Sequence, residues 1–210
     1  MIYNVKNNFN NIFDKDEKLI LAIYGSPRKN GNTEELMKKF EEGLKNNKQL
    51  NLSGYYFDKV FIRDLKFSSC IECRHCSLDG ECALKDDMQQ IYPKLINADF
   101  IVVSSPIFFT SVSGYLKAFV DRCQRFWSLK YELNKKIIFK ERNGIFISTA
   151  GSSSITIFDC AKKVIKELFN VLYVNFSNSF VYNKIDFKGD IFKNPDALNE
   201  VYEYGKNLII

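Results

Sequence analysis

Short, uninterrupted apolar runs that end in glycine, serine or proline recur along this chain, and they limit its possible folds more than any other feature. Residues 19–24 have the sequence LILAIY, followed by Gly-Ser-Pro, and residues 100–103 have the sequence FIVV, followed by Ser-Ser-Pro. A strand buried on both faces of a parallel sheet is apolar throughout, whereas a half-exposed strand alternates. Both runs therefore predict interior strands of a parallel sheet. Further strands are predicted at residues 55–62, 144–148 and 171–182.

Segments with apolar residues at helical spacing separate these runs. They comprise residues 33–44, 86–96, 113–126, 155–168 and 195–208. Strands that alternate with helices, without an internal repeat, predict an α/β fold with a doubly wound, five-stranded parallel sheet. We expect one domain over residues 18–210, with residues 64–85 as a cysteine-rich insertion after the second strand and residues 1–17 as a polar N-terminal arm.

Composition and charge exclude several other classes of protein. The 210 residues are 46% hydrophobic and 26% charged, which excludes a wholly disordered chain. The net charge of +5 is too small and too dispersed for a nucleic-acid-binding surface. No apolar run reaches the roughly 18 residues of a membrane span, and the first residues lack the features of a secretory signal. We therefore expect a cytoplasmic protein without nucleic-acid or membrane partners.

The loop after the first predicted strand (GSPRKNGNT) has the composition of an anion-binding turn. Ser26 and Thr33 offer hydroxyl groups, Asn32 an amide and Arg28 a positive charge, and Gly31 lets the main chain approach a ligand. The loop leads into a helix N-terminus, whose free N–H groups and dipole favour an anion. A phosphate held there needs no carboxylate and would tolerate none close by. It matches neither of the common glycine-rich nucleotide motifs, and a capped turn without a ligand is the alternative. Its position in the first βα turn of a doubly wound sheet favours a phosphate.

Two further loops are expected at the same edge of the sheet, because the carboxyl ends of parallel strands meet there. Residues 105–114 are apolar and aromatic, so a flat ligand, the protein's own core or a second subunit should cover them. Residues 148–154 offer hydroxyl and N–H groups to a polar ring edge, or they simply cap a helix. Together the three loops indicate a planar phosphorylated cofactor, and FMN fits the switch point of flavodoxin-like sheets.

Four of the six cysteines lie within 13 residues of one another. They are Cys70, Cys73, Cys76 and Cys82. Two-residue gaps let neighbouring sulfur atoms face one centre, as in ferredoxin motifs. A [4Fe–4S] cluster, free thiols and a zinc ion are all compatible with the motif, although structural zinc sites usually pair two C-x2-C knuckles across a longer gap. Cys123 and Cys160 lie on predicted helices, where we expect buried free thiols.

Three segments of the chain resemble the NADPH-dependent FMN reductase family, and more narrowly its iron–sulfur flavoprotein branch. They are GSPRKNGNT, the C-x2-C-x2-C-x5-C motif that continues into KDDM, and ADFIVVSSPIFFTSVSGYLKAFVDR. The resemblance covers about residues 18–155 and implies a flavodoxin-like fold with FMN as the cofactor.

The resemblance also implies which residues bind the cofactors. The FMN phosphate would lie on Ser26, Arg28, Asn32 and Thr33. The isoalloxazine ring would lie along Pro106, Ile107, Phe108 and Phe109. Its polar edge would face Thr149, Ala150 and Gly151. Gly31 and Ser111, from the same loops, complete the expected cofactor-binding set. In the iron–sulfur branch, a motif with this spacing binds a [4Fe–4S] cluster, which implies the ligands Cys70, Cys73, Cys76 and Cys82.

The implied activity is that of an FMN-dependent oxidoreductase that passes electrons between FMN and a [4Fe–4S] cluster, with NAD(P)H or a ferredoxin as the donor. Because a flavin supplies the redox chemistry itself, no catalytic side chain is expected. The family implies that the cluster approaches a flavin across a subunit interface, hence a homodimer or homotetramer. The alternatives are a cluster-free NAD(P)H-dependent FMN or quinone reductase, a flavodoxin-like electron carrier without enzymatic activity, and a zinc-stapled interaction module.

Overall fold

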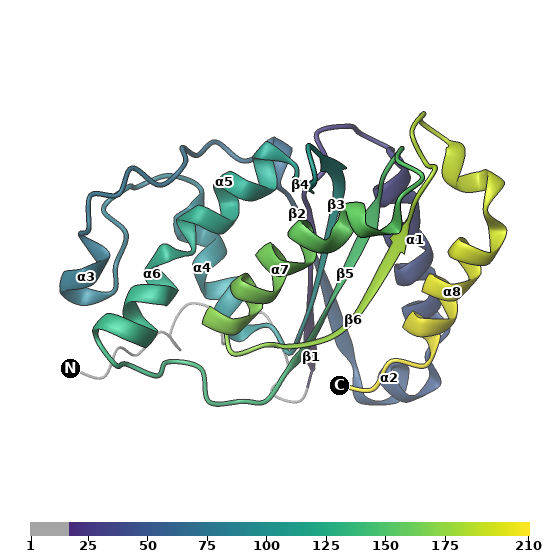
Figure 1. Ribbon diagram of the computed structural model, residues 1–210. Coiled ribbons are helices and arrows are strands. Elements are labelled where there is room, and N and C mark those ends of the chain that lie inside the picture. The colour runs from purple at the N-terminus through teal and green to yellow at the C-terminus, as the bar shows by residue number, and fades with distance from the viewer. Residues whose placement is uncertain (1–16) are drawn as a thin grey trace.

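The computed structural model describes residues 17–210 and has a parallel β-sheet at its centre (Figure 1). The strands of this sheet are β1 (Lys18–Tyr24), β2 (Tyr55–Phe61), β3 (Phe100–Phe108), β5 (Asn143–Thr149) and β6 (Asn175–Tyr182). They pair in the order β2-β1-β3-β5-β6. The order reverses between β1 and β3, as in a flavodoxin-like doubly wound sheet, so the predicted fold class is confirmed. The predicted N-terminal arm lies outside the described residues, except for its last residue.

Helices cover both faces of the sheet (Figure 1). On one face lie α1 (Asn32–Lys45) and α8 (Pro195–Lys206), and on the other lie α4 (Met88–Asn97), α5 (Gly114–Arg122) and α7 (Asp159–Val171). Side chains of β1 alternate between the two cores: Leu21 packs with the second group of helices and Ala22 with the first. This two-sided burial explains why the strand is apolar throughout.

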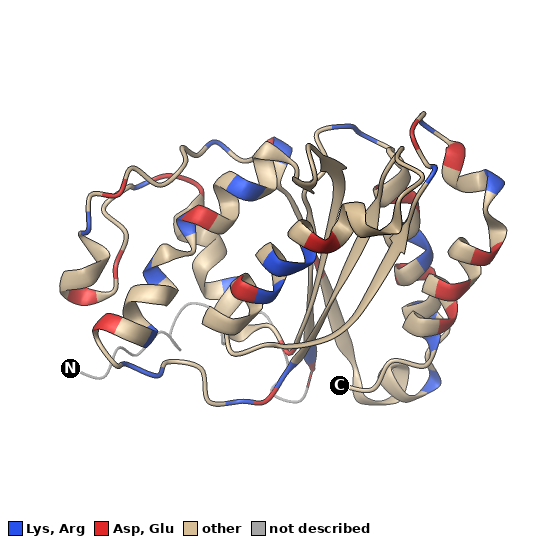
Figure 2. Ribbon diagram, viewed as in Figure 1, with Lys and Arg blue, Asp and Glu red and all other residues tan. Residues whose placement is uncertain are grey.

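The remaining elements are short. They are α2 (Lys48–Ser53), η2 (Ile62–Asp64), α3 (Cys76–Asp79), β4 (Ser111–Val112), α6 (Gln124–Trp127), the π-helical turn η3 (Ser128–Glu132), η4 (Ile155–Phe158) and η5 (Asp190–Lys193). Residues 64–85, predicted as an insertion, connect η2 to α4 and contain only α3 as a helix of their own. No helix among the described residues is long and apolar enough to cross a membrane. Figure 2 shows basic and acidic residues interspersed along α7.

The third strand does not stop at the Ser-Ser-Pro sequence, and that prediction was wrong. β3 continues to Phe108 because it pairs with β5 as far as Pro106 and then with β4 in an antiparallel hairpin. The hairpin turns at Phe109 and Thr110, which both have positive φ, as a two-residue turn requires. Buried Ser105 fits inside the strand because its hydroxyl group accepts a hydrogen bond from the Ser113 N–H at 2.9 Å.

Two further predictions of element boundaries were wrong. The helix predicted over 113–126 is broken at Cys123, whose N–H bonds the carbonyl of Val120, three residues back. The chain then continues through α6 into η3. The last strand was predicted to begin at residue 171 but begins at Asn175, since α7 extends through Val171.

Glycine lets α1 and α8 pack with their main chains in contact. A Cβ atom on Gly43 would overlap the carbonyl oxygen of Tyr202, and one on Gly205 would overlap the carbonyl oxygen of Phe40. Since both obstacles are main-chain atoms, they cannot move aside as a side chain could. Helix α1, which follows the loop after β1, is thereby fixed against the C-terminal helix.

We predict that Gly43→Ala destabilises the protein by about 1–3 kcal/mol, the usual cost of overpacking. The matched control is Gly114→Ala in α5, where an added Cβ meets no atom within 4 Å. Gly114 is the first residue of α5, so this control gains less than the roughly 1 kcal/mol of propensity that alanine brings to a helix interior. A destabilised Gly43→Ala beside a nearly unchanged Gly114→Ala therefore reports the overlap. Urea unfolding measures both free energies, and equal values for the two variants would contradict this packing argument.

Candidate functional site

The end of β3 and the loops that follow β1, β5 and β6 meet around a small hollow of about 60 Å³ at the carboxyl edge of the sheet. The hollow is lined by Ser26, Arg28, Gly31, Asn32, Thr33, Pro106, Ile107, Phe108, Thr149, Ala150, Gly151, Ile185, Asp186 and Lys188. The structure thus brings together every predicted cofactor-binding residue except Phe109 and Ser111. The last three lining residues belong to the loop after β6, which the sequence analysis did not include.

Phe109 and Ser111 belong to the hairpin of β3 and β4 but do not line the hollow. The Phe109 side chain is fully exposed at the turn, and Ser111 pairs with Phe108 across the hairpin. Phe108 itself borders the hollow and is 43% exposed. The hairpin therefore offers one aromatic side chain to a ligand in the hollow and a second to the solvent.

The loop after β1 begins at Gly25, where the main chain lies close to two other elements. The Gly25 N–H donates to the carbonyl of Ser104 in β3 at 2.8 Å, and the Ser113 hydroxyl group donates to the Gly25 carbonyl. A Cβ atom at this position would lie 2.8 Å from the Ser104 carbonyl oxygen and 2.9 Å from Cβ of Leu116. Residue 25 must therefore be glycine for the loop to leave the sheet along this path.

The first turn of α1 leaves N–H groups available to a ligand. Its N-cap residue is Gly31, which provides no side-chain cap. The N–H groups of Glu34 and Glu35 bond the Gly31 carbonyl at 2.9 and 3.0 Å, so those of Asn32 and Thr33 are the ones without an intrahelical acceptor. Nearby, the buried hydroxyl oxygen of Ser26 accepts the Arg28 N–H at 3.2 Å. This arrangement suits a tetrahedral anion.

The side chain of Asn32 is occupied by the loop after β6. Its Nδ2 donates to the carbonyl of Phe187 at 2.9 Å, and its Oδ1 accepts the N–H of Gly189 at 2.9 Å. The carboxamide therefore positions the loop that carries Asp186 and Lys188 into the hollow. The main-chain N–H of Asn32 remains available to a ligand.

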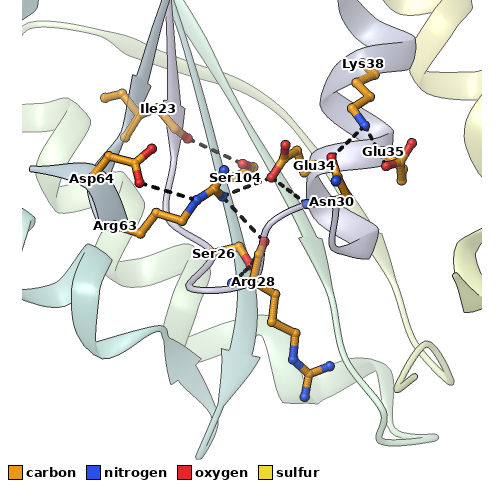
Figure 3. Close-up of polar contacts among 10 residues, drawn as sticks. All are labelled: Ile23, Ser26, Arg28, Asn30, Glu34, Glu35, Lys38, Arg63, Asp64 and Ser104. Atoms are coloured by element: carbon orange, nitrogen blue, oxygen red, sulfur yellow. Dashed lines mark hydrogen bonds and ion pairs between the residues drawn. The ribbon is translucent and has the colours of Figure 1, made fainter. Parts of the chain in front are cut away.

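Charged groups of both signs surround the start of α1. Arg28 and Lys188 are exposed cations that border the hollow, and the Arg28 guanidinium lies 3.5 Å from the carbonyl oxygen of Asp186. A buried carboxylate, that of Glu34, lies in the first turn of α1, and Arg63 Nη1 donates to it at 3.0 Å (Figure 3). A bare carboxylate here would repel an anion, and Arg63 neutralises this one.

All four clustered cysteines line a second, larger cavity of about 510 Å³. Cys70 and Cys73 are exposed, whereas Cys76 and Cys82 are half-buried. The Sγ of Cys76 lies 3.3 Å from the Ser128 hydroxyl oxygen in η3. Over residues 17–210, no three His, Cys, Asp or Glu side chains are already arranged to hold a metal ion. The thiols thus share one cavity without forming a preassembled ligand set.

Two buried arginines also line the cysteine cavity. Arg122 donates to the Asp86 carboxylate at 2.6 Å and to Cys82 Sγ at 3.4 Å. Burial raises the pKa of Asp86, but the hydrogen bonds and charge of Arg122, together with hydrogen bonds from the main-chain N–H groups of Met88 and Ser68, outweigh it, and the pKa lies below its usual value. Arg125 pairs with Glu81 at 2.5 Å. Positive charge beside sulfur atoms favours thiolates and anionic groups.

The two remaining cysteines differ from each other. Cys123 is buried as predicted, and burial raises the pKa of its thiol to about 12. The prediction that Cys160 is buried was wrong, because it is exposed. α7 begins at Asp159, so Cys160 lies in its first turn on the side away from buried Ala161 and Ile165.

The two candidate sites lie at different ends of the molecule. Figure 1 shows α3 and α6, which flank the cysteine cavity, far from the β3–β4 hairpin that borders the hollow. One chain therefore does not bring its cysteines next to its own hollow.

The fold and the hollow define a flavodoxin-like α/β protein whose first βα loop lies at the switch point of its sheet. The chain belongs to the NADPH-dependent FMN reductase family, whose model matches residues 19–179.

Curated relatives agree with this membership. An iron–sulfur flavoprotein of Archaeoglobus fulgidus is 33% identical over 102 residues, which are 49% of this chain and 44% of that protein. One of Methanosarcina thermophila is 32% identical over 133 residues, 63% of each chain. The matches thus span about half to two thirds of these relatives. A solved NAD(P)H:quinone oxidoreductase of Methanothermobacter marburgensis is 15% identical, with a TM-score of 0.62 over 91% of this chain and 96% of that one, and supports the fold alone.

We predict that Asn32→Ala loosens the loop after β6, because it removes the carboxamide that bonds Phe187 and Gly189. Hydrogen–deuterium exchange of the main-chain amides of residues 186–191 should become faster. Asn51→Ala is the control, since its exposed carboxamide bonds only the Lys45 carbonyl. Unchanged protection of residues 186–191 in Asn32→Ala would contradict the positioning role of Asn32.

Proposed function

We propose that this chain is an FMN-dependent oxidoreductase and that the FMN phosphate binds at the start of α1. One observation carries the proposal: the uncapped N–H groups of Asn32 and Thr33 adjoin the same hollow as the Ser26 hydroxyl group and the Arg28 side chain. Helix N-termini and cations are the groups that proteins use to bind phosphate. Membership of the FMN reductase family supports FMN as the phosphate-bearing ligand.

The size of the hollow supports a bound FMN whose phosphate lies inside the hollow and whose ring lies outside it. A volume of about 60 Å³ suits a phosphate group, whereas whole ligand pockets measure roughly 300–1,000 Å³. We propose that the isoalloxazine ring lies at the open rim, against Ile107 and Phe108 on one side and the turn of Thr149, Ala150 and Gly151 on the other. A Cβ on Gly151 would lie 2.9 Å from the Asp186 carboxylate, so glycine lets the loop after β6 close beside this turn.

The chain's own task is then binding and orientation. Bound FMN supplies hydride and one-electron chemistry. The half-exposed Phe108 offers an apolar surface that excludes water from one edge of the ring. We assign no acid or base to a side chain.

We further propose that Cys70, Cys73, Cys76 and Cys82 bind a [4Fe–4S] cluster. Four thiols on one cavity form the usual donor set for such a cluster, and the buried cations Arg122 and Arg125 offset its negative charge. The relatives named iron–sulfur flavoproteins support this choice over zinc or free thiols. Because two of the cysteines are exposed, residues 70–82 would close around the cluster when it binds.

The separation of the two sites supports a homo-oligomer, either a dimer or a tetramer, in which the cluster of one chain meets the flavin of another. NAD(P)H and a reduced ferredoxin are the proposed electron donors. Six unpaired cysteines favour a reducing compartment such as the cytoplasm.

We expect the wild-type protein to bind FMN at least about tenfold more tightly than riboflavin, a difference of about 1.4 kcal/mol. Arg28→Ala should weaken FMN binding by about tenfold, the effect of a lost charge-assisted hydrogen bond, and leave riboflavin binding unchanged. Lys29→Ala is the control, because this neighbouring exposed cation does not line the hollow. Fluorescence titration measures all these affinities, and equal affinities of the wild-type protein for FMN and riboflavin would contradict the proposal.

After anaerobic purification, we expect iron and acid-labile sulfide in equal amounts. Cys73→Ala should lose both and retain FMN binding, since the cavity and the hollow are separate. Cys160→Ala, which changes an exposed cysteine outside the cavity, should retain both. Full iron content in Cys73→Ala would refute the ligand assignment. Zinc without iron in the wild-type protein would refute the proposed cluster, but it would not contradict the proposed FMN site.

A further inference from the structure

An ion pair with little solvent exposure, which the proposed function does not use, lies beside the loop of residues 26–31. Arg63, which follows β2 in η2, donates from Nη1 to Oε2 of Glu34 at 3.0 Å. The two side chains are only 10% and 9% exposed. Figure 3 shows the pair between the end of β2 and the first turn of α1.

Both members of the pair also bind the main chain of the loop. Arg63 Nη1 lies 3.4 Å from the carbonyl oxygen of Arg28, and Glu34 Oε2 accepts the N–H of Asn30 at 3.1 Å. Asn30 has a φ of 52°, in the left-handed region that is unfavourable for most side chains. Asparagine adopts this conformation more readily than most residues, and the ion pair holds the turn in place just before the N–H groups of α1.

Aromatic rings hold the arginine in place. Its guanidinium carbon lies 4.7 Å from the centre of the Phe61 ring, and Phe61 stacks on Tyr24 of β1 at 4.3 Å. Asp64 also lies 4.0 Å from Arg63 Nε, but its side chain is 54% exposed, so solvent largely screens this second carboxylate. Glu34 is thus the partner whose charge Arg63 neutralises in the interior.

The carboxylate of Glu34 and a bound phosphate would repel each other, since both carry negative charge at the start of the same helix. Little solvent screens a charge that is nine-tenths buried. With Arg63 in place, the pair is neutral and the helix N-terminus favours an anion. Without Arg63, the carboxylate would stay buried and unpaired, which is strongly unfavourable, and it would oppose the phosphate.

We propose that Arg63 is a positioning residue for the FMN phosphate: it neutralises Glu34 and fixes the loop of residues 26–31, and so it makes the site prefer FMN over riboflavin. This inference rests on the proposed function, because it assumes that the phosphate binds at the start of α1. It adds a residue outside the lining of the hollow and outside every motif in the sequence.

The test compares FMN and riboflavin affinities, by fluorescence titration, in a set of variants. Arg63→Met should lower FMN affinity by about tenfold or more and riboflavin affinity much less, because only FMN carries the opposed charge. Adding Glu34→Gln to Arg63→Met should restore the preference for FMN, since the neutral amide oxygen can still accept the Asn30 N–H. A purely structural role of Arg63 would weaken both ligands alike and would not be rescued in this way.

Two further variants keep the inference testable if Arg63→Met does not fold. Glu34→Gln alone leaves an uncompensated cation and should tighten FMN binding by about threefold, the size of a charge effect at a helix N-terminus, with riboflavin unchanged. Asp64→Asn removes the exposed carboxylate and should change neither affinity. Unaltered FMN preference in both Arg63→Met and Glu34→Gln would overturn the inference. Absence of that preference from the wild-type protein would instead overturn the proposed function.

Discussion

The main chain of Gly25 lies against β3 and α5 with no room for a side chain, and the rest of the candidate site depends on this contact. The N–H of Gly25 bonds one strand and its carbonyl accepts the Ser113 hydroxyl group at the start of α5. These bonds set the direction in which the chain leaves β1. That direction in turn determines where α1 begins, and hence where its unbonded N–H groups and the hydroxyl group of Ser26 meet.

An arginine side chain with little solvent exposure pairs with a carboxylate at each candidate site. Arg63 pairs with Glu34 beside the hollow, and Arg122 pairs with Asp86 at the cysteine cavity. In both arginines, Nε has no hydrogen-bond partner within the described part of the chain. A neutralised pair can lie in the interior where a lone charge could not. An arginine–carboxylate pair would thus lie beside the proposed phosphate site and beside the proposed cluster site.

The sequence predicted those parts of the structure that local patterns encode. The apolar run of β1 predicted an interior parallel strand, and the chain order of loops predicted which residues meet at the carboxyl edge. The hairpin at Phe109 was missed because Ser-Ser-Pro usually ends a strand, and only pairing with β5 and β4 carries β3 through it. Asp186 and the partnership of Arg63 with Glu34 were missed because they depend on contacts between residues 29 or more positions apart, which no local spacing encodes.

The central claim is that the start of α1 binds the phosphate of FMN, and a crystal structure of the protein with FMN tests it most directly. The account predicts phosphate oxygens within hydrogen-bonding distance of the main-chain N–H groups of Asn32 and Thr33 and of the Ser26 hydroxyl group. It also predicts that the Arg63–Glu34 pair persists in the complex. A phosphate that points away from the protein, or that binds in the cysteine cavity or elsewhere on the surface, would contradict this claim.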